Sequence, residues 1–131
     1  MKTCRLSFVL VLAAAVLILF GNQAYAAGPR EDIVRAYFLI KVSNNNYSGH
    51  RDAALKELEI VGHELGLDLR SRGHNDQPQG QSDAQMNEAF QILRVARDKL
   101  DAHDREHEAG HLENALHEVD LALHVSNSRR R

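Results

Sequence analysis

The sequence predicts an all-α protein, an antiparallel four-helix bundle made of two helical hairpins. Three observations support this. Apolar residues recur at intervals of three and four along most of residues 30 to 125. The composition is poor in aromatic residues, with no tryptophan and only two prolines, both outside the periodic segments. The chain also contains an internal repeat, in which 49–63 aligns without gaps with 110–124, as expected for two similar hairpins.

The first 26 residues have the pattern of a secretory signal peptide. Lys2 and Arg5 form a positive start, an apolar run follows from 6 to 20, and Ala24-Tyr25-Ala26 suits cleavage. The alternative is an uncleaved signal that anchors the chain in a membrane, although a run of about 15 residues is short for a span. We therefore expect a periplasmic or secreted protein that begins at Ala27.

The mature chain that this predicts has no cysteine, because Cys4 lies within the signal. Disulfides, thiolate metal sites and CxxCH haem attachment are excluded for it. Cleavage removes two of the 16 basic residues and none of the 18 acidic ones, so the formal charge changes from −2 to −4. That balance argues against nucleic acid as a partner. No nucleophile-and-base pair or glycine-rich phosphate loop appears, so an enzyme is not predicted.

Four helices are expected in the 27–131 domain, at about 30–43, 48–71, 82–107 and 111–125, with a flexible linker at 73–81. The first carries apolar residues on more than one side. Ser82 to Gln85 has the form of a capping box at the start of the third helix, and Gly110 is expected to end that helix. In an up-down-up-down bundle both hairpin tips would lie at the same end, which would bring His50 near the second tip.

Five of the eight histidines fall within residues 103–124, between carboxylates. Imidazole binds zinc, copper, nickel and cobalt, and neighbouring carboxylates orient the ring and offset the charge of the ion. The stripe Met86, Ala89, Leu93, Ala96, Leu100 continues to His103 and His107, so these two are expected to chelate an ion from one helix. His111 could be a third ligand, and His50 or a carboxylate a fourth.

Other histidine pairs are too far apart to share one ion. His50 and His63 would be separated by roughly 20 Å along a helix, as would His111 and His124. His117 and His124 would be separated by about 10 Å. For His63, His117 and His124 the simpler expectation is a solvated polar face.

The run from Ala109 to His124, AGHLENALHEVDLALH, resembles the repeat of the small metal-binding protein family, as does the stretch from Gly49 to His63 more loosely. Members of that family are histidine-rich periplasmic four-helix bundles that bind several divalent metals, copper among them. The resemblance implies that His50, His63, His111 and His124 are metal ligands. His117 also fits the repeat, but Lys56 replaces it in the earlier copy.

The sequence thus favours periplasmic binding of a divalent transition metal ion (Cu, Ni, Zn or Co) for buffering, transport or tolerance, through His103, His107, His111, His50, His117, His124 and His63. Without a thiol, Cu(I) is disfavoured. The alternative is a metal-free interaction or scaffold module that self-associates as a homo-oligomer, or binds a partner, through apolar positions on a second face: Ile60, Leu67 and Leu121.

Overall fold

A computed structural model of the protein describes residues 28–44, 46–69 and 78–131. These residues form four α-helices: α2 (Pro29–Val42), α3 (His50–Glu64), α4 (Gln79–Asp101) and α5 (Glu106–Arg129). The predicted signal peptide, residues 1–26, lies outside the described residues. In the part of the chain that is described, no helix is both long enough and apolar enough to cross a membrane.

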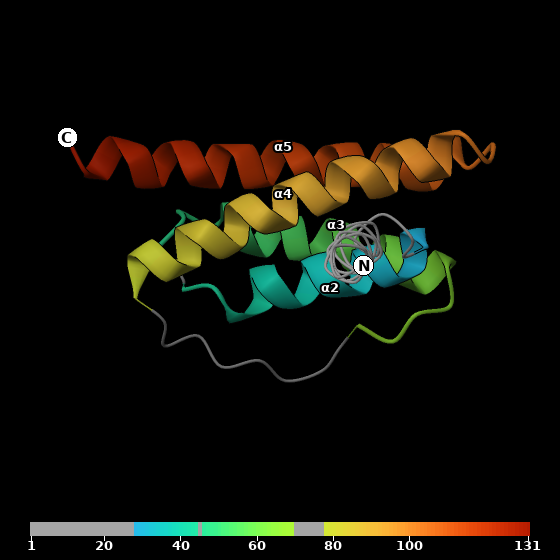
Figure 1. Ribbon diagram of the computed structural model, residues 1–131, viewed down its shortest axis with the longest axis horizontal. Coiled ribbons are helices and arrows are strands. Elements are labelled where there is room, and N and C mark those ends of the chain that lie inside the picture. The colour runs from blue at the N-terminus through green and yellow to red at the C-terminus, as the bar shows by residue number, and fades with distance from the viewer. Residues whose placement is uncertain (1–27, 45, 70–77) are drawn as a thin grey trace, which may run out of the picture.

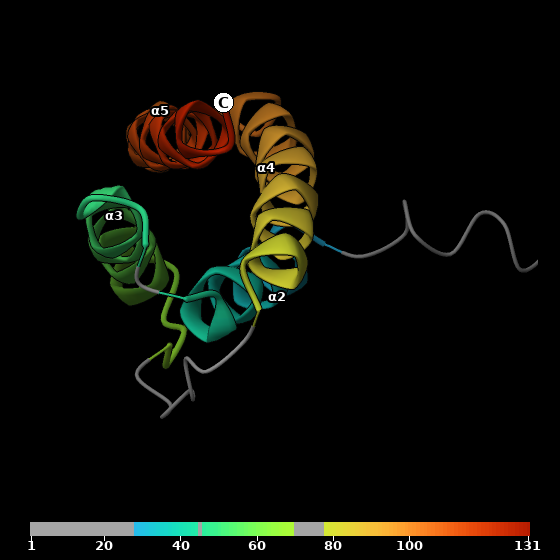
Figure 2. The same ribbon diagram turned by 90° about the vertical axis from the view of Figure 1, so that its left-hand side faces the viewer.

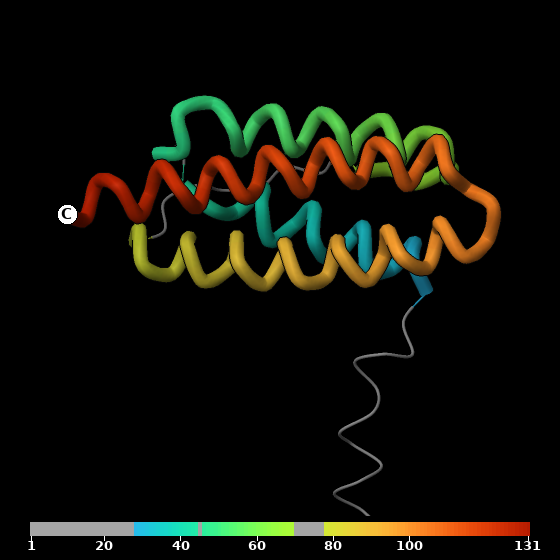
Figure 3. The backbone as a smooth tube through the Cα atoms, turned by 90° about the horizontal axis from the view of Figure 1, so that it is seen from above, coloured from blue at the N-terminus to red at the C-terminus, as the bar shows by residue number. Residues whose placement is uncertain are grey.

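The helices form a four-helix bundle, which confirms the predicted fold class (Figure 1). Each helix packs against two neighbours, in the order α2, α4, α5, α3 around the bundle (Figure 2). Neighbouring helices are antiparallel, so the pairs α2–α3 and α4–α5 are the two predicted hairpins. Helices α3 and α5 lie side by side in opposite directions, and this contact carries the candidate site (Figure 3).

The two hairpin tips lie at opposite ends of the bundle, so the prediction of a shared end is wrong. At the α2–α3 tip, the Asn44 amide donates to Ser82 Oγ at 3.0 Å, and Arg129 donates to the carbonyl of Asn46 at 2.8 Å. This tip therefore lies beside the start of α4 and the end of α5, far from the turn at 102–105 (Figure 1).

This arrangement requires α3 and α4 to run in the same direction across the diagonal of the bundle. The segment 65–78 connects the end of α3 to the start of α4. At up to about 3.3 Å per residue it reaches further than the roughly 22 Å length of α3. A connection of this length allows α4 to begin at the end of the bundle where α3 begins. The predicted up-down-up-down topology instead has the third helix begin where the second one ends.

Helix α3 is shorter than the predicted 48–71 because a glycine ends it. Gly66 has a φ of 67°, and the Leu67 amide donates to the Gly62 carbonyl at 2.7 Å. Such a left-handed residue commonly terminates a helix. The chain then folds back so that Leu69 covers Gly62, where an added Cβ would lie 2.5 Å from Leu69 Cδ1. The two leucines expected on the helix, Leu65 and Leu69, are buried nevertheless.

The boundary between α4 and α5 also differs from the prediction of 82–107 and 111–125. Helix α4 ends at Asp101, and α5 begins at Glu106 and continues through Gly110 to Arg129. In the turn, Asp104 has a φ of 56° and the Arg105 amide donates to the Leu100 carbonyl at 3.1 Å. Aspartate tolerates this left-handed conformation, and no apolar side chain after Leu100 holds the helix to the core.

A largely buried polar cluster, which we call the Asp83 cluster, joins the start of α4 to the other hairpin tip. Asp83 accepts hydrogen bonds from Tyr47 Oη (2.8 Å), Gln79 Nε2 (2.7 Å) and Ser126 Oγ (2.7 Å), and it pairs with Arg130. The predicted capping box at Ser82 is therefore wrong: the helix starts earlier, at Gln79, and Ser82 and Asp83 bond to other segments. The predicted 73–81 linker likewise ends before Gln79, and its residues 73–77 lie outside the described residues.

The core is formed by the predicted apolar stripes. Met86, Ala89, Leu93 and Ala96 of α4 are completely buried, as are Leu112, Ala115, Val119 and Ala122 of α5. The large apolar side chains that stay exposed among the described residues are Phe38 (38%) and Ile60 (40%). Of the three positions that we predicted for self-association, Ile60 is exposed, and Leu67 and Leu121 are half-buried.

Candidate metal centre

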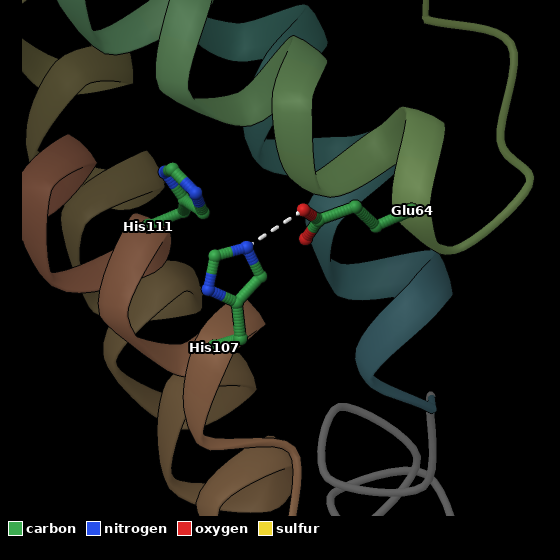
Figure 4. A group of neighbouring side chains, drawn as sticks. All are labelled: Glu64, His107 and His111. Atoms are coloured by element: carbon green, nitrogen blue, oxygen red, sulfur yellow. Dashed lines mark ion pairs between the residues drawn. The ribbon is translucent and has the colours of Figure 1, made fainter.

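The candidate site lies where α5 begins and α3 ends. Helix α5 places His107 and His111 one turn apart on the side that faces α3, and Glu64 faces them from the last residue of α3 (Figure 4). Each of the three side chains offers one ligand atom, and these atoms lie within 4.8 Å of one another. Among the residues that the structure describes, this is the group of histidine and carboxylate side chains that comes close enough for a metal ion.

His107 and Glu64 make the most direct contact in the site. His107 Nε2 lies 3.0 Å from Glu64 Oε1, and the side chains are 74% and 26% exposed. The ring of His107 meets that of His111 edge to face, with centroids 4.9 Å apart and planes at 84°. The site is therefore open to solvent on the His107 side, and an ion could reach it without any helix moving.

His111 is more enclosed, and a second carboxylate holds it. His111 Nδ1 lies 2.7 Å from Glu57 Oε2, and both side chains are about a quarter exposed. Asn114 Nδ2 approaches the same oxygen at 3.4 Å. Because Nδ1 is engaged with Glu57, the nitrogen that remains free for an ion is Nε2.

The spacing is close to what a tetrahedral ion requires. Ligand atoms at about 2.0–2.1 Å from one ion lie roughly 3.3 Å from each other at tetrahedral angles. The distance between His107 Nε2 and Glu64 Oε1 is already close to this value. Side-chain rotations that move the ligand atoms by about 1 Å would bring the His111 nitrogen to the same distance. Two imidazoles and one carboxylate suit a borderline divalent ion and leave at least one position for water or another ligand.

Glu108 also lies next to the site, but it pairs with Arg105. Arg105 Nε donates to Glu108 Oε1 at 2.8 Å, and this hydrogen bond lowers the pKa of the Glu108 carboxyl below its ordinary value. Glu108 therefore pairs within the first turn of α5 instead of completing the ligand set.

The predicted chelate of His103 and His107 on one helix is wrong. His103 is exposed in the turn that follows α4, whereas His107 lies in the first turn of α5. The two residues belong to different segments because the chain leaves the helix after Asp101. The two histidines that lie four residues apart on one helix are instead His107 and His111 of α5.

His50 does not reach the site. Its Nδ1 lies 2.8 Å from Glu118 Oε2, at the first turn of α3. Glu64, the candidate ligand on α3, is the last residue of that helix and His50 is the first, so roughly 20 Å of helix separates them. The expectation that His50 supplies a ligand here fails because the two hairpin tips lie at opposite ends.

The other three predicted ligands lie on the surface. His63 is exposed on α3, and His117 is exposed beside a shallow groove between α4 and α5. The His124 ring lies 3.4 Å from Asp120 Oδ2, one turn before it on α5, and its side chain is 73% exposed. These positions agree with a solvated polar face.

Sequence reasoning missed the two carboxylates that face the histidines. Glu64 carried no signal of its own, since its approach to His107 depends on the register between α3 and α5. Glu57 had one signal, because the internal repeat aligns it with Glu118, which also contacts a histidine.

The fold and the site together define a four-helix bundle with a candidate metal centre of two histidines and one carboxylate. Comparisons with protein-family models, with characterised proteins and with solved structures found no match to this chain. The resemblance to the small metal-binding protein family therefore stays a prediction from the sequence.

Proposed function

We propose that this protein binds a divalent transition metal ion, such as Cu²⁺, Ni²⁺, Zn²⁺ or Co²⁺, through Glu64, His107 and His111. The observation that carries the proposal is the convergence of three ligand atoms from two helices within 4.8 Å. Imidazole nitrogen is a common ligand for all four ions, and the carboxylate offsets part of the charge of the ion. The absence of a thiol from the predicted mature chain disfavours Cu(I).

The exposure of the site favours a role in exchange over a role in maintaining the fold. Structural zinc sites are closed by four protein ligands, whereas three protein ligands leave a position open. Here one of the three ligands, His107, is 74% exposed, and the core is filled by apolar side chains. Such a site suits buffering, transport or tolerance of metal ions, and the predicted signal peptide would place that activity in the periplasm or outside the cell.

Titration of metal-free protein with Zn²⁺ tests the proposal. We expect one tight site per chain, and His107→Ala should weaken its affinity at least about tenfold, because even outer residues of metal sites contribute that much. His124→Ala is the matched control, because it removes an exposed histidine that contacts a carboxylate on the same helix. Equal affinities for wild type, H107A and H124A would contradict the proposed site.

A further inference from the structure

Helices α3 and α5 contact each other through two equivalent pairs of side chains. His50 of α3 contacts Glu118 of α5 at 2.8 Å, and His111 of α5 contacts Glu57 of α3 at 2.7 Å. The internal repeat converts one pair into the other, since His50 aligns with His111, and Glu57 with Glu118. Each helix thus offers a histidine to the other and accepts one from it, the reciprocal pattern of a two-fold interface.

The two pairs have similar geometry but different surroundings. Nδ1 is the histidine atom in both contacts, and all four side chains are between 22% and 30% exposed. Beside His111 lie the two further candidate ligands, His107 and Glu64. The same alignment, extended by a few positions, assigns Asn46 and Val125 to the corresponding positions beside His50. Among the residues that the structure describes, only the His111–Glu57 pair is therefore accompanied by further candidate ligands.

We propose that Glu57 is a positioning residue for the metal centre, which fixes His111 in the form that binds the ion through Nε2. The inference rests on the proposed function. A neutral imidazole has one nitrogen that donates and one that accepts, and an ionised carboxylate only accepts. The hydrogen bond to Glu57 therefore places the proton on Nδ1 and leaves the lone pair of Nε2 for the metal.

Loss of this contact weakens binding in two ways. Without Glu57 the proton of His111 is free to occupy Nε2, where it prevents ligation, and the ring is free to rotate away from His107. Partners that orient a metal-bound histidine typically contribute about 10- to 100-fold to metal affinity. The Glu118 carboxylate holds its histidine in the same way, but no metal affinity depends on it.

The test compares Glu57→Ala with Glu118→Ala in the full chain. Both variants remove a carboxylate that contacts a histidine across the same two helices, so they control for each other in fold and stability. We expect Glu57→Ala to weaken Zn²⁺ binding by about 10- to 100-fold and Glu118→Ala to stay within about twofold of wild type. Glu57→Gln should recover part of the affinity, because its amide oxygen still accepts the Nδ1 proton.

Nitrogen NMR of the histidine rings gives a readout that a purely structural role would not change. In metal-free protein at about pH 8.5, where imidazoles are ordinarily neutral, His111 should carry its proton on Nδ1 in wild type and Glu118→Ala. In Glu57→Ala it should show a mixture of both forms.

The inference is overturned if wild type binds Zn²⁺ and Glu57→Ala binds it equally well, or if both alanine variants lose affinity equally. It is also overturned if the His111 proton is unchanged in Glu57→Ala. A wild-type protein that binds no Zn²⁺, or in which His107→Ala changes nothing, refutes the proposed site itself and this inference with it.

Discussion

Replacing Asp83 with alanine should destabilise the bundle more than any substitution of an exposed carboxylate. Asp83 accepts three hydrogen bonds of 2.7–2.8 Å from the α2–α3 tip, from α4 and from α5. Hydrogen bonds to a charged group contribute about 1.5–3 kcal/mol each, but bonds in one cluster are not additive. The substitution also leaves the hydroxyl of Tyr47, a fully buried residue, without its acceptor, at a cost of about 1–3 kcal/mol.

We therefore expect Asp83→Ala to lower the free energy of unfolding by about 2–4 kcal/mol, which is less than the sum of the separate hydrogen bonds because these are coupled and the cationic partner Arg130 is 53% exposed. Urea denaturation followed by circular dichroism measures this directly. Asp98→Ala is the control, because Asp98 pairs with Arg97 but is 68% exposed, and its loss should stay within about 0.5 kcal/mol. A change of less than about 1 kcal/mol for Asp83→Ala would refute the claim that this cluster fixes the end of the bundle.

Three further predictions concern the end of α3, the alkaline limit of stability and the metal. Gly62→Ala should destabilise the wild-type protein, because its Cβ would overlap Leu69, but should stabilise a Leu69→Ala variant by about 0.5–1 kcal/mol through better helix propensity; the same sign of effect in both, measured by urea denaturation, would contradict the packing. Burial raises the pKa of the Tyr47 phenol above 10.0, so folding favours the neutral hydroxyl. The contribution of this hydroxyl to the free energy of unfolding is complete below about pH 10 and is lost as the pH rises through the folded-state pKa. The difference in unfolding free energy between wild type and Tyr47→Phe should therefore narrow above about pH 10, and a constant difference would be the contrary result. Zn²⁺ at about 100 times its Kd should stabilise wild type by about 2.7 kcal/mol, a rise in Tm on the order of 10 °C in thermal melts; an equal rise for His107→Ala would mean that the ion binds elsewhere.

The apolar pattern was sufficient to predict the helices and their buried faces. The stripe of α4, from Met86 to Leu100, is buried as expected, because a helix that repeats apolar residues every three or four positions must cover that face. Patterning was less reliable at the helix ends. His103 and His107 continue the spacing of that stripe, but a histidine gains too little from burial to extend a helix, and the chain turned at Asp104 instead.

The direction of the hairpins could not be predicted from local pattern. It depends on contacts between distant residues, such as Tyr47 with Asp83 and Asn44 with Ser82. The segment between α3 and α4 is long enough for the two hairpin tips to lie at the same end or at opposite ends of the bundle. Because the predicted topology was wrong, His50 was expected at the same end of the bundle as His107 and His111.

The candidate site was predicted in part. His107 and His111 were expected to be ligands, and the spacing of four residues that joins them is a local property of a helix. Their carboxylate partners come from α3, and which glutamates face α5 depends on the register of the two helices. Only the internal repeat contained information on that register, through Glu57 and Glu118.

The central claim, that an ion binds between the end of α3 and the start of α5, is tested most directly by anomalous X-ray scattering from crystals grown with Zn²⁺. The account predicts a zinc peak about 2.0–2.2 Å from the ligand atoms of His107, His111 and Glu64. A peak confined to other histidines, such as His50 or His124, or no peak at any of the three residues would contradict it.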